Sequence, residues 1–152
     1  MYFEQLSSDS KVWVYQVNRP FSELEKGQIS DRFKDFVASW AAHGSKLLAD
    51  ATIIDNYFVV LSVDEKVAMA SGCSIDTSVK FIKQIGLQFN IDFFNRLKLV
   101  VQKEGETKMV DFSDLIEYEN WNIYNTLVNT VEQLNTSFLI PVKESELFKM
   151  IS

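Results

Sequence analysis

ATIIDNYFVVLSV, residues 51–63, is the stretch of this sequence that decides the predicted fold. β-Branched and aromatic side chains dominate on both sides of Asp55 and Asn56, two residue types that tolerate the dihedral angles of tight turns. Residues 51–54 and 57–63 therefore predict a β-hairpin. The second strand of this hairpin is apolar at nearly every position, which indicates burial on both faces of a sheet.

The segment before the hairpin predicts a strand followed by a helix. Residues 11–17, KVWVYQV, are mostly β-branched or aromatic, and Pro20 stops the strand because proline cannot donate a ladder hydrogen bond. Ser22 and Glu25 have the spacing of a capping box. Apolar residues at helical spacing then continue as far as Gly44, which predicts a helix of about five turns.

The segment after the hairpin repeats the order of helix and strand. Ser74 is placed to cap a helix that ends at Asn90. A short aromatic connector leads to an alternating strand at residues 97–101, which a turn joins to a further strand at residues 108–110. The apolar stripe of this helix consists of Ile75, Val79, Ile82, Ile85 and Phe89.

The order strand, helix, strand, strand, helix, strand predicts an α+β fold with a ferredoxin-like βαββαβ core. That topology needs two central strands, and the strands at residues 11–17 and 57–63 are apolar on both faces. We expect one domain over residues 1–152, with an added β-hairpin and a C-terminal extension packed on the core. Its parts are an N-terminal segment (1–10), the core (11–103), and the hairpin with the extension (104–152), whose short elements are expected at 114–118, 123–128, 131–134, 140–142 and 145–150.

Composition limits the classes of partner and location. A net charge of -6 and a pI near 4.8 argue against a nucleic-acid partner, which would need a basic face. One cysteine cannot form an internal disulfide, and the N-terminus has no basic and apolar leader pattern, so we expect a reduced, soluble, cytoplasmic protein. The longest apolar run, residues 57–63, is far shorter than the ~20 residues that span a membrane, so we expect no membrane association.

The predicted topology brings a set of polar residues to one end of the sheet. The first helix delivers His43 to the end where the third strand finishes at Asp64 and the second helix begins. Arg19 and Arg96 fall at the opposite end. The residues expected to converge are His43, Asp64, Glu65, Ser71, Cys73, Ser74 and Asp76.

Cys73 and His43 are the candidate catalytic residues of this set. A thiol at a helix N-terminus is stabilised as the thiolate by the helix dipole, and a nearby imidazole would act as its base. The alternative is structural. A free cysteine is commonly a small buried residue, and a histidine just before Gly44 would stabilise the C-terminal end of the first helix.

Ser71, Gly72, Ser74 and Asp76 surround the start of the second helix, where backbone N–H groups can hold an anion or a small ligand. The alternative is an ordinary helix cap with Asp76 stabilised by the dipole.

Arg19 and Arg96 could likewise recognise a carboxylate or a phosphate. The alternative for this pair is a surface ion pair with Asp92 or Glu23.

Asp64, Glu65 and Asp76 are weak candidates for a divalent cation site, since hard cations prefer oxygen ligands. No ligand pattern of known spacing is present, and solvated loop carboxylates are the alternative. Gly44-Ser45-Lys46 resembles the end of a phosphate-binding loop, but Ser39 stands where the first glycine is required. The sequence therefore excludes a Walker-type ATPase, and we expect no cofactor.

Several motifs together resemble a known group of proteins. They are Val14-Tyr15-Gln16, Ala42-His43-Gly44, Val63-Asp64-Glu65, the run from Ala70 to Asp76, and Ile91 to Arg96. On these residues the chain resembles, over nearly its whole length, a small uncharacterised family from Bacteroidota whose members often carry the label ABC transporter ATPase. No activity is assigned to that family, so the resemblance implies none.

The sequence leaves three functions open. The first is a non-catalytic binding or assembly module, with a homodimer or a protein partner formed through an exposed sheet edge or the region of Trp121 and Tyr124. The second is a small enzyme that uses Cys73 as nucleophile and His43 as base. The third is a hydrolase with a metal held by carboxylates.

Overall fold

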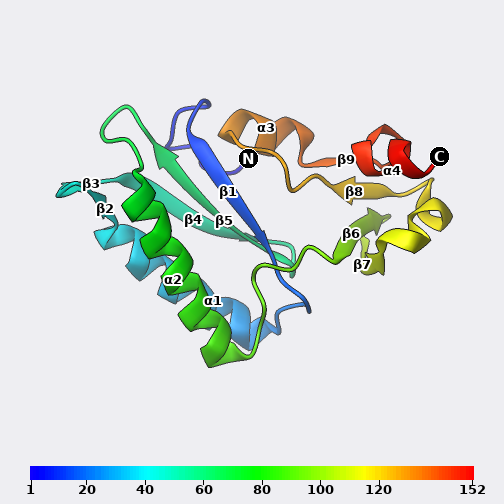
Figure 1. The fold of residues 1–152 in the computed structure, drawn as a ribbon, viewed down its shortest axis with the longest axis horizontal. Helices are drawn as coiled ribbons and strands as arrows, with labels where there is room; N and C mark the ends of the chain where they lie inside the picture. Colours follow the sequence, from blue (N-terminus) through cyan, green and yellow to red (C-terminus); the bar gives the residue numbers. More distant parts are fainter.

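A three-stranded antiparallel sheet forms the centre of the N-terminal half (Figure 1). In the computed structural model, which describes residues 1–152, the strand order is β1-β5-β4, so the predicted hairpin is confirmed and its second strand is central. Leu61 of β5 faces Trp13 on one side and Ala51 on the other. The elements of this half are β1 (Lys11–Gln16), α1 (Glu23–Ser39), β2 (Ala41–Ala42), β3 (Ser45–Lys46), β4 (Leu48–Ile54), β5 (Phe58–Asp64) and α2 (Gly72–Phe89).

The first helix begins as predicted and ends earlier. The side chain of Ser22 accepts from the Glu25 amide, and the Glu25 side chain accepts from the Ser22 amide, which confirms the capping box. The prediction that the helix continues to Gly44 is wrong, because Trp40 is extended and buried. His43 and Gly44, with φ of 50° and 78°, instead form the two-residue turn of the β2–β3 hairpin.

The second helix begins three residues before the predicted start. Ser71, not Ser74, is the N-cap: each of these two side chains accepts from the backbone amide of the other. Asn90 ends the helix in the left-handed conformation, as predicted. The predicted apolar stripe faces the core, with Ile82 and Ile85 fully buried.

Aromatic side chains join the two helices to each other and to the sheet. Phe81 of α2 packs edge-on against Phe33 and stacks on Phe36, both from α1. Trp13 of β1 meets Trp40 at a centroid distance of 6.3 Å. A fully buried phenylalanine contributes about 1.5–3 kcal/mol through removal of its surface from water. The two helices therefore lie side by side over one face of the sheet.

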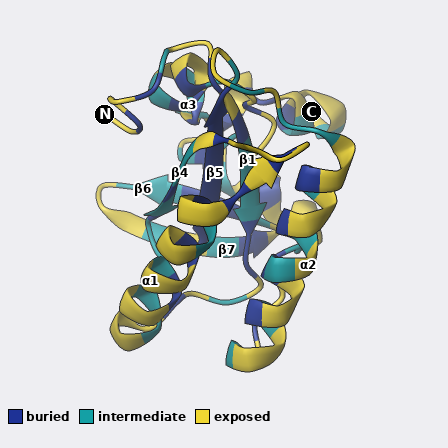
Figure 2. Cartoon of the chain, turned by 90° about the vertical axis from the view of Figure 1, so that its left-hand side faces the viewer, coloured by how far each residue is buried: buried dark blue, intermediate teal, exposed yellow.

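The N-terminal segment and residues 124–138 pack against the same sheet, and every residue of β5 is buried (Figure 2). Phe58 contacts Tyr124 and Phe138 of the C-terminal segment. Phe3 of the N-terminal segment and Val131 near the C-terminus belong to the same hydrophobic core. The main core thus extends beyond residues 11–103 at both ends.

The C-terminal third forms a separate four-stranded antiparallel sheet in the order β7-β6-β8-β9. A second, smaller hydrophobic cluster lies beneath it, with Val101 and Leu115 fully buried. The short elements predicted for the extension are present, but the strand expected at 123–128 ends at Tyr124. The elements of this third are β6 (Lys98–Lys103), β7 (Glu106–Asp111), the 3-10 helix η1 (Phe112–Tyr118), β8 (Asn122–Tyr124), α3 (Val131–Ser137), β9 (Leu139–Pro141), the 3-10 helix η2 (Val142–Glu144) and α4 (Glu146–Ile151).

The α+β class is therefore confirmed, whereas the predicted ferredoxin-like arrangement is not, because the strand order differs and the chain forms additional sheets. Three strands have the expected order, but the fourth strand, β6, pairs with β7 and β8 instead of with β1. β1 is consequently an edge strand rather than a central one. The reason is tertiary: the extension supplies β8 as a partner for β6, and its chain around Thr130 occupies one end of the β1 edge.

Candidate functional site

A cavity of about 630 Å³ lies where the missing fourth strand would have paired with β1. Its walls come from β1, from the connector between α2 and β6, from β8 with the loop that follows it, and from the start of α4. Volumes of this size are typical of ligand pockets in proteins. The position of this cavity follows directly from the departure of β6 from the first sheet.

Three consecutive residues of β1, namely Val14, Tyr15 and Gln16, line the cavity. Trp13 and Tyr15 lie on one face of β1, where they contact Trp40 and Phe94. Gln16 points the other way, and its Nε2 donates to the carbonyl oxygen of Lys98 at 2.7 Å. Its amide oxygen accepts no hydrogen bond within the chain. Val14, on the same face as Gln16, also lines the cavity.

Two large apolar side chains of the cavity lining are exposed to solvent. Leu97 and Leu127, which both line the cavity, keep 85% and 79% of their surface exposed. Arg96 lies beside Leu97 and forms no ion pair or hydrogen bond within the chain. The cavity therefore combines exposed apolar side chains with the unpaired guanidinium of Arg96, and its lining also includes the carboxylates of Glu144 and Glu146.

A hydrogen-bonded latch joins the two sheets next to the cavity. Asp55, at the tip of the β4–β5 hairpin, accepts from the hydroxyl of Tyr124 at 2.8 Å and from that of Thr107 at 3.1 Å. Burial and the neighbouring Asp55 carboxylate raise the pKa of Tyr124. The phenol is therefore a neutral donor at ordinary pH, and the latch fixes the distance between the two sheets.

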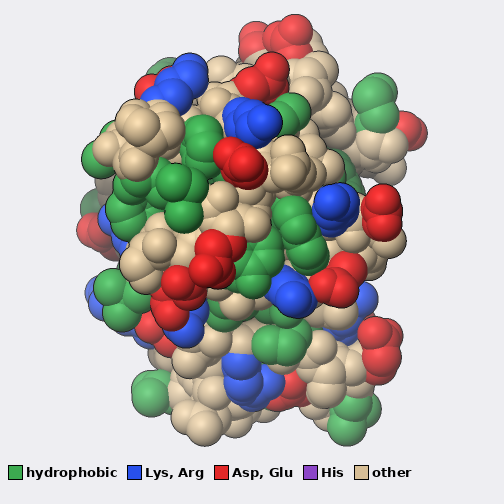
Figure 3. Space-filling view, turned by 90° about the vertical axis from the view of Figure 1, so that its right-hand side faces the viewer, with side chains coloured by type: hydrophobic (Ala, Val, Ile, Leu, Met, Phe, Trp, Pro, Cys, Tyr) green, Lys and Arg blue, Asp and Glu red, His purple; other side chains and the backbone are tan.

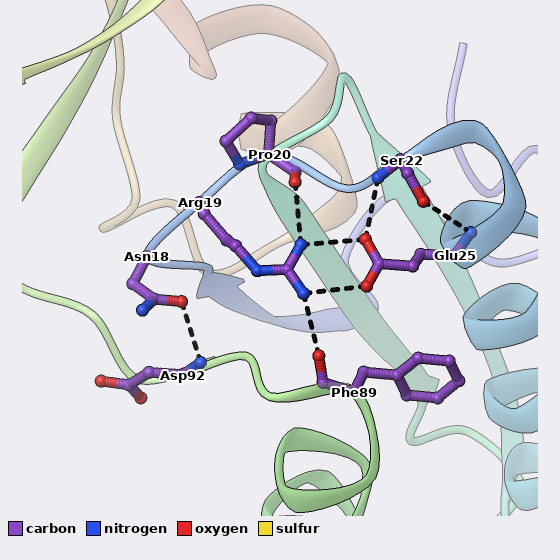
Figure 4. Close-up of polar contacts among 7 residues, drawn as sticks. All are labelled: Asn18, Arg19, Pro20, Ser22, Glu25, Phe89 and Asp92. Carbon is purple, nitrogen blue, oxygen red and sulfur yellow. Dashed lines mark hydrogen bonds and ion pairs between the residues drawn. The ribbon is translucent and has the colours of Figure 1, made fainter.

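The guanidinium of Arg19 forms its hydrogen bonds with groups of the same chain (Figure 4). Its guanidinium makes a two-pronged contact with the Glu25 carboxylate at 2.9 and 2.8 Å and donates to the carbonyl oxygen of Phe89 at the end of α2. The hydrogen bond from Arg19 lowers the pKa of Glu25 to about 2. The partner is Glu25 rather than the expected Glu23 or Asp92. Arg19 and Arg96 thus lie toward the same end of the first sheet, but only Arg96 faces the cavity.

The start of α2 is an ordinary and well-satisfied helix cap. Ser71 and Ser74 are occupied with each other, and the Ser74 carbonyl accepts from the buried indole of Trp40 at 2.8 Å. Gly72 and Asp76 are exposed and make no side-chain hydrogen bond. These contacts give the turn a structural role in holding α2 against the end of α1.

Cys73 and His43 are both exposed, and no hydrogen bond joins them. His43 is carried by the β2–β3 turn rather than by a helix end. The expected convergence is correct at the level of segments, since Trp40 and Ser74 link these regions. It does not produce a nucleophile–base contact.

Asp64 and Glu65, which were considered as ligands of a divalent cation, bind different partners within the chain. Asp64 is buried and accepts from the amides of Lys66 and Ser7, which lowers its pKa. Glu65 accepts from the Ala70 amide and pairs with Lys11 at 3.1 Å. No group of three or more His, Cys, Asp or Glu side chains in this structure is arranged to hold a metal ion.

The aromatic residues considered for dimer contacts are engaged within the chain. Trp121 packs edge-on against Tyr118, with the Lys108 ammonium 5.6 Å from the Trp121 ring centre. Tyr124 donates to Asp55, as described above. On the side of the molecule formed by the C-terminal elements, hydrophobic side chains lie scattered among charges of both signs (Figure 3).

Sequence reasoning found Arg96 but missed the cavity. The available signal was weak: Leu97 and Leu127 are large apolar residues in segments that were predicted to be extended, where apolar residues are ordinary. Only the pairing of β6 away from β1 turns those segments into walls.

Comparison with protein-family models, with curated proteins and with solved structures gives no match for this chain. None of its helices combines the length and apolar character needed to cross a membrane.

Proposed function

We propose that this protein is a non-catalytic binding module and that its ligand occupies the cavity beside β1. The observation that carries the proposal is a 630 Å³ cavity whose rim leaves Leu97 and Leu127 largely exposed. Large apolar side chains around a concave site favour binding of an apolar group. The free guanidinium of Arg96 favours a ligand that also has an anionic group.

The proposal places the ligand at a different site from the helix start considered in the sequence. The cap at Ser71 and Ser74 satisfies its own polar groups, whereas the cavity leaves Arg96 and the Gln16 amide oxygen free. Assembly with a partner remains part of this proposal, since the same cavity opens along a sheet edge.

Titration with 1-anilinonaphthalene-8-sulfonate, which has an apolar body and a sulfonate, tests the proposal. We expect saturable fluorescence enhancement with the wild type and at least severalfold weaker binding to the double variant Leu97→Ser/Leu127→Ser. The matched control is Leu24→Ser, an exposed leucine of α1 at 72% exposure. Equal binding to all three proteins would reject the cavity as the ligand site.

A further inference from the structure

The edge of β1 that faces away from β5 has a defined set of free hydrogen-bonding groups. The Val12 amide donates to Asn129, which shows that residue 12 points its backbone away from β5. Because this direction alternates along a strand, Val14 and Gln16 point the same way. The Gln16 carbonyl confirms this direction, since it accepts from the Asn95 amide at 3.2 Å.

Between these two ends, four backbone groups have no partner within the chain. They are the carbonyl of Val12, the amide and the carbonyl of Val14, and the amide of Gln16. Their order of acceptor, donor, acceptor, donor is the pattern that one further strand pairs with. The span from Val12 to Gln16 is about 13 Å at the rise of a β-strand, so a segment of three or four extended residues fits it.

Three of these four groups belong to cavity-lining residues, since Val14 and Gln16 line the cavity. Backbone donors and acceptors that are buried are rarely left unpaired in native proteins. Water can form hydrogen bonds with these groups in the free protein, but it leaves the apolar side chains of Leu97 and Leu127 exposed. An extended polypeptide matches both, because its backbone pairs with the strand edge while alternate side chains enter an apolar groove.

Charge complementarity defines one end of this occupant. The Asn95 amide bonds the Gln16 carbonyl, so Arg96 lies at the Gln16 end of the free edge. The other basic residue of the lining, Lys98, is already paired with Asp111 at 3.1 Å. Arg96 is therefore the free cation, and it would pair with an acidic residue of the bound segment.

We propose that the occupant is an extended, apolar segment of another protein that adds a strand to β1 and places an acidic residue against Arg96. This inference rests on the proposed function and specifies its ligand. It predicts that affinity depends on the outward-facing backbone groups of β1, which a small apolar ligand would not use.

Val14→Pro is the decisive variant, with Val14→Ala as its control. Proline removes the Val14 amide hydrogen, which has no partner in the free chain, and removes no donor or acceptor of the hydrogen bonds between β1 and β5. The probes are two blocked, fluorescein-labelled octapeptides of alternating valine and threonine. One has a glutamate at its N-terminal end, and the other has a glutamate at its C-terminal end. We expect anisotropy titrations to show binding that Val14→Pro weakens about tenfold or more relative to Val14→Ala, the effect of one lost hydrogen bond together with strand distortion.

A second measurement does not depend on the variant folding. Peptides N-methylated on alternate residues keep their side chains but lose the donors that would face β1. They should bind the wild type about tenfold more weakly than the unmodified peptides. In parallel, Arg96→Glu should weaken binding of the glutamate-containing peptides. Lys80→Glu, which changes an exposed residue of α2 and serves as the control, should leave this binding unchanged.

Each alternative result has a defined meaning. Equal binding of methylated and unmodified peptides overturns the strand-pairing proposal. Dye binding at the cavity without peptide binding overturns it as well, while the proposed function stands. If neither probe binds, both proposals fall. If sedimentation shows a dimer that Val14→Pro dissociates, the occupant is a second copy of this chain and the proposal of a separate partner is wrong.

Discussion

Two glycines in helices should respond in opposite directions to the same substitution by alanine. Gly27 lies within α1, and a Cβ built there meets nothing within 4 Å. Gly86 lies within α2, where a Cβ would stand 2.6 Å from the backbone oxygen of Ile91, closer than real Cβ atoms approach. Alanine favours a helix interior over glycine by about 1 kcal/mol, so the local contribution is the same at both positions.

The Ile91 oxygen cannot move cheaply away from the new methyl group. The Ile91 amide donates to the Gly86 carbonyl at 2.9 Å, and the next amide, of Asp92, donates to the Asn18 side chain. Overpacking of this kind costs about 1–3 kcal/mol, which exceeds the helix gain. We therefore expect Gly27→Ala to raise the free energy of unfolding by about 1 kcal/mol and Gly86→Ala to lower it by about 1 kcal/mol.

Urea unfolding followed by tryptophan fluorescence measures both changes, and thermal unfolding should shift by about 2–4 °C per kcal/mol in a chain of this size. The connector after Gly86 also forms a wall of the cavity, so Gly86→Ala should weaken dye binding while Gly27→Ala leaves it unchanged. If both variants are stabilised to the same extent, the close approach of α2 to Ile91 does not constrain this region, and the reasoning is refuted.

Three further measurements test the structure at other points. The folded pKa of Glu25 is about 2 against an ordinary value of 4.5, so its carboxylate stabilises the native state above about pH 4.5 and loses this effect as the pH falls through 2. Glu25→Gln should accordingly be less stable than the wild type at pH 7, with a difference that shrinks toward pH 2 in urea titrations. Trp40→Phe leaves the Ser74 carbonyl without its donor and should cost about 1–3 kcal/mol, measured by urea unfolding against the wild type. Because Cys73 is exposed, iodoacetamide should modify it in the folded protein, and His43→Ala should leave the rate unchanged; a slower rate in that variant would support a catalytic pair.

Local signals in the sequence were sufficient wherever neighbouring residues determine the structure. The Ser22–Glu25 capping box and the turn at Asp55 and Asn56 are short-range patterns; the capping box is present as predicted, and the turn is present with Tyr57 as a third residue. The 3.6-residue spacing of apolar positions likewise identified the buried face of α2. Such features depend on hydrogen bonds and side-chain directions within a few residues, so the chain carries them wherever it folds.

Competition between distant partners decided the remaining features. Trp40 is buried in the core in an extended conformation, so α1 ends before His43. Ser71 and Ser74 form reciprocal capping hydrogen bonds, so α2 begins at Gly72 rather than after Ser74. Arg19 could reach several carboxylates, and the packing of α2 against the loop after β1 selected Glu25.

The cavity is the clearest product of tertiary structure. Either β1 or β8 could form backbone hydrogen bonds with β6, and in the structure β8 does so. The edge of β1 at Val14 therefore has no strand partner, and Arg96 lines the same cavity as Val14. Strand pairing joins residues that are far apart in the chain through backbone groups that every residue has. For that reason the sequence determined where the strands are, and only the folded chain determined which edge remained free for a partner.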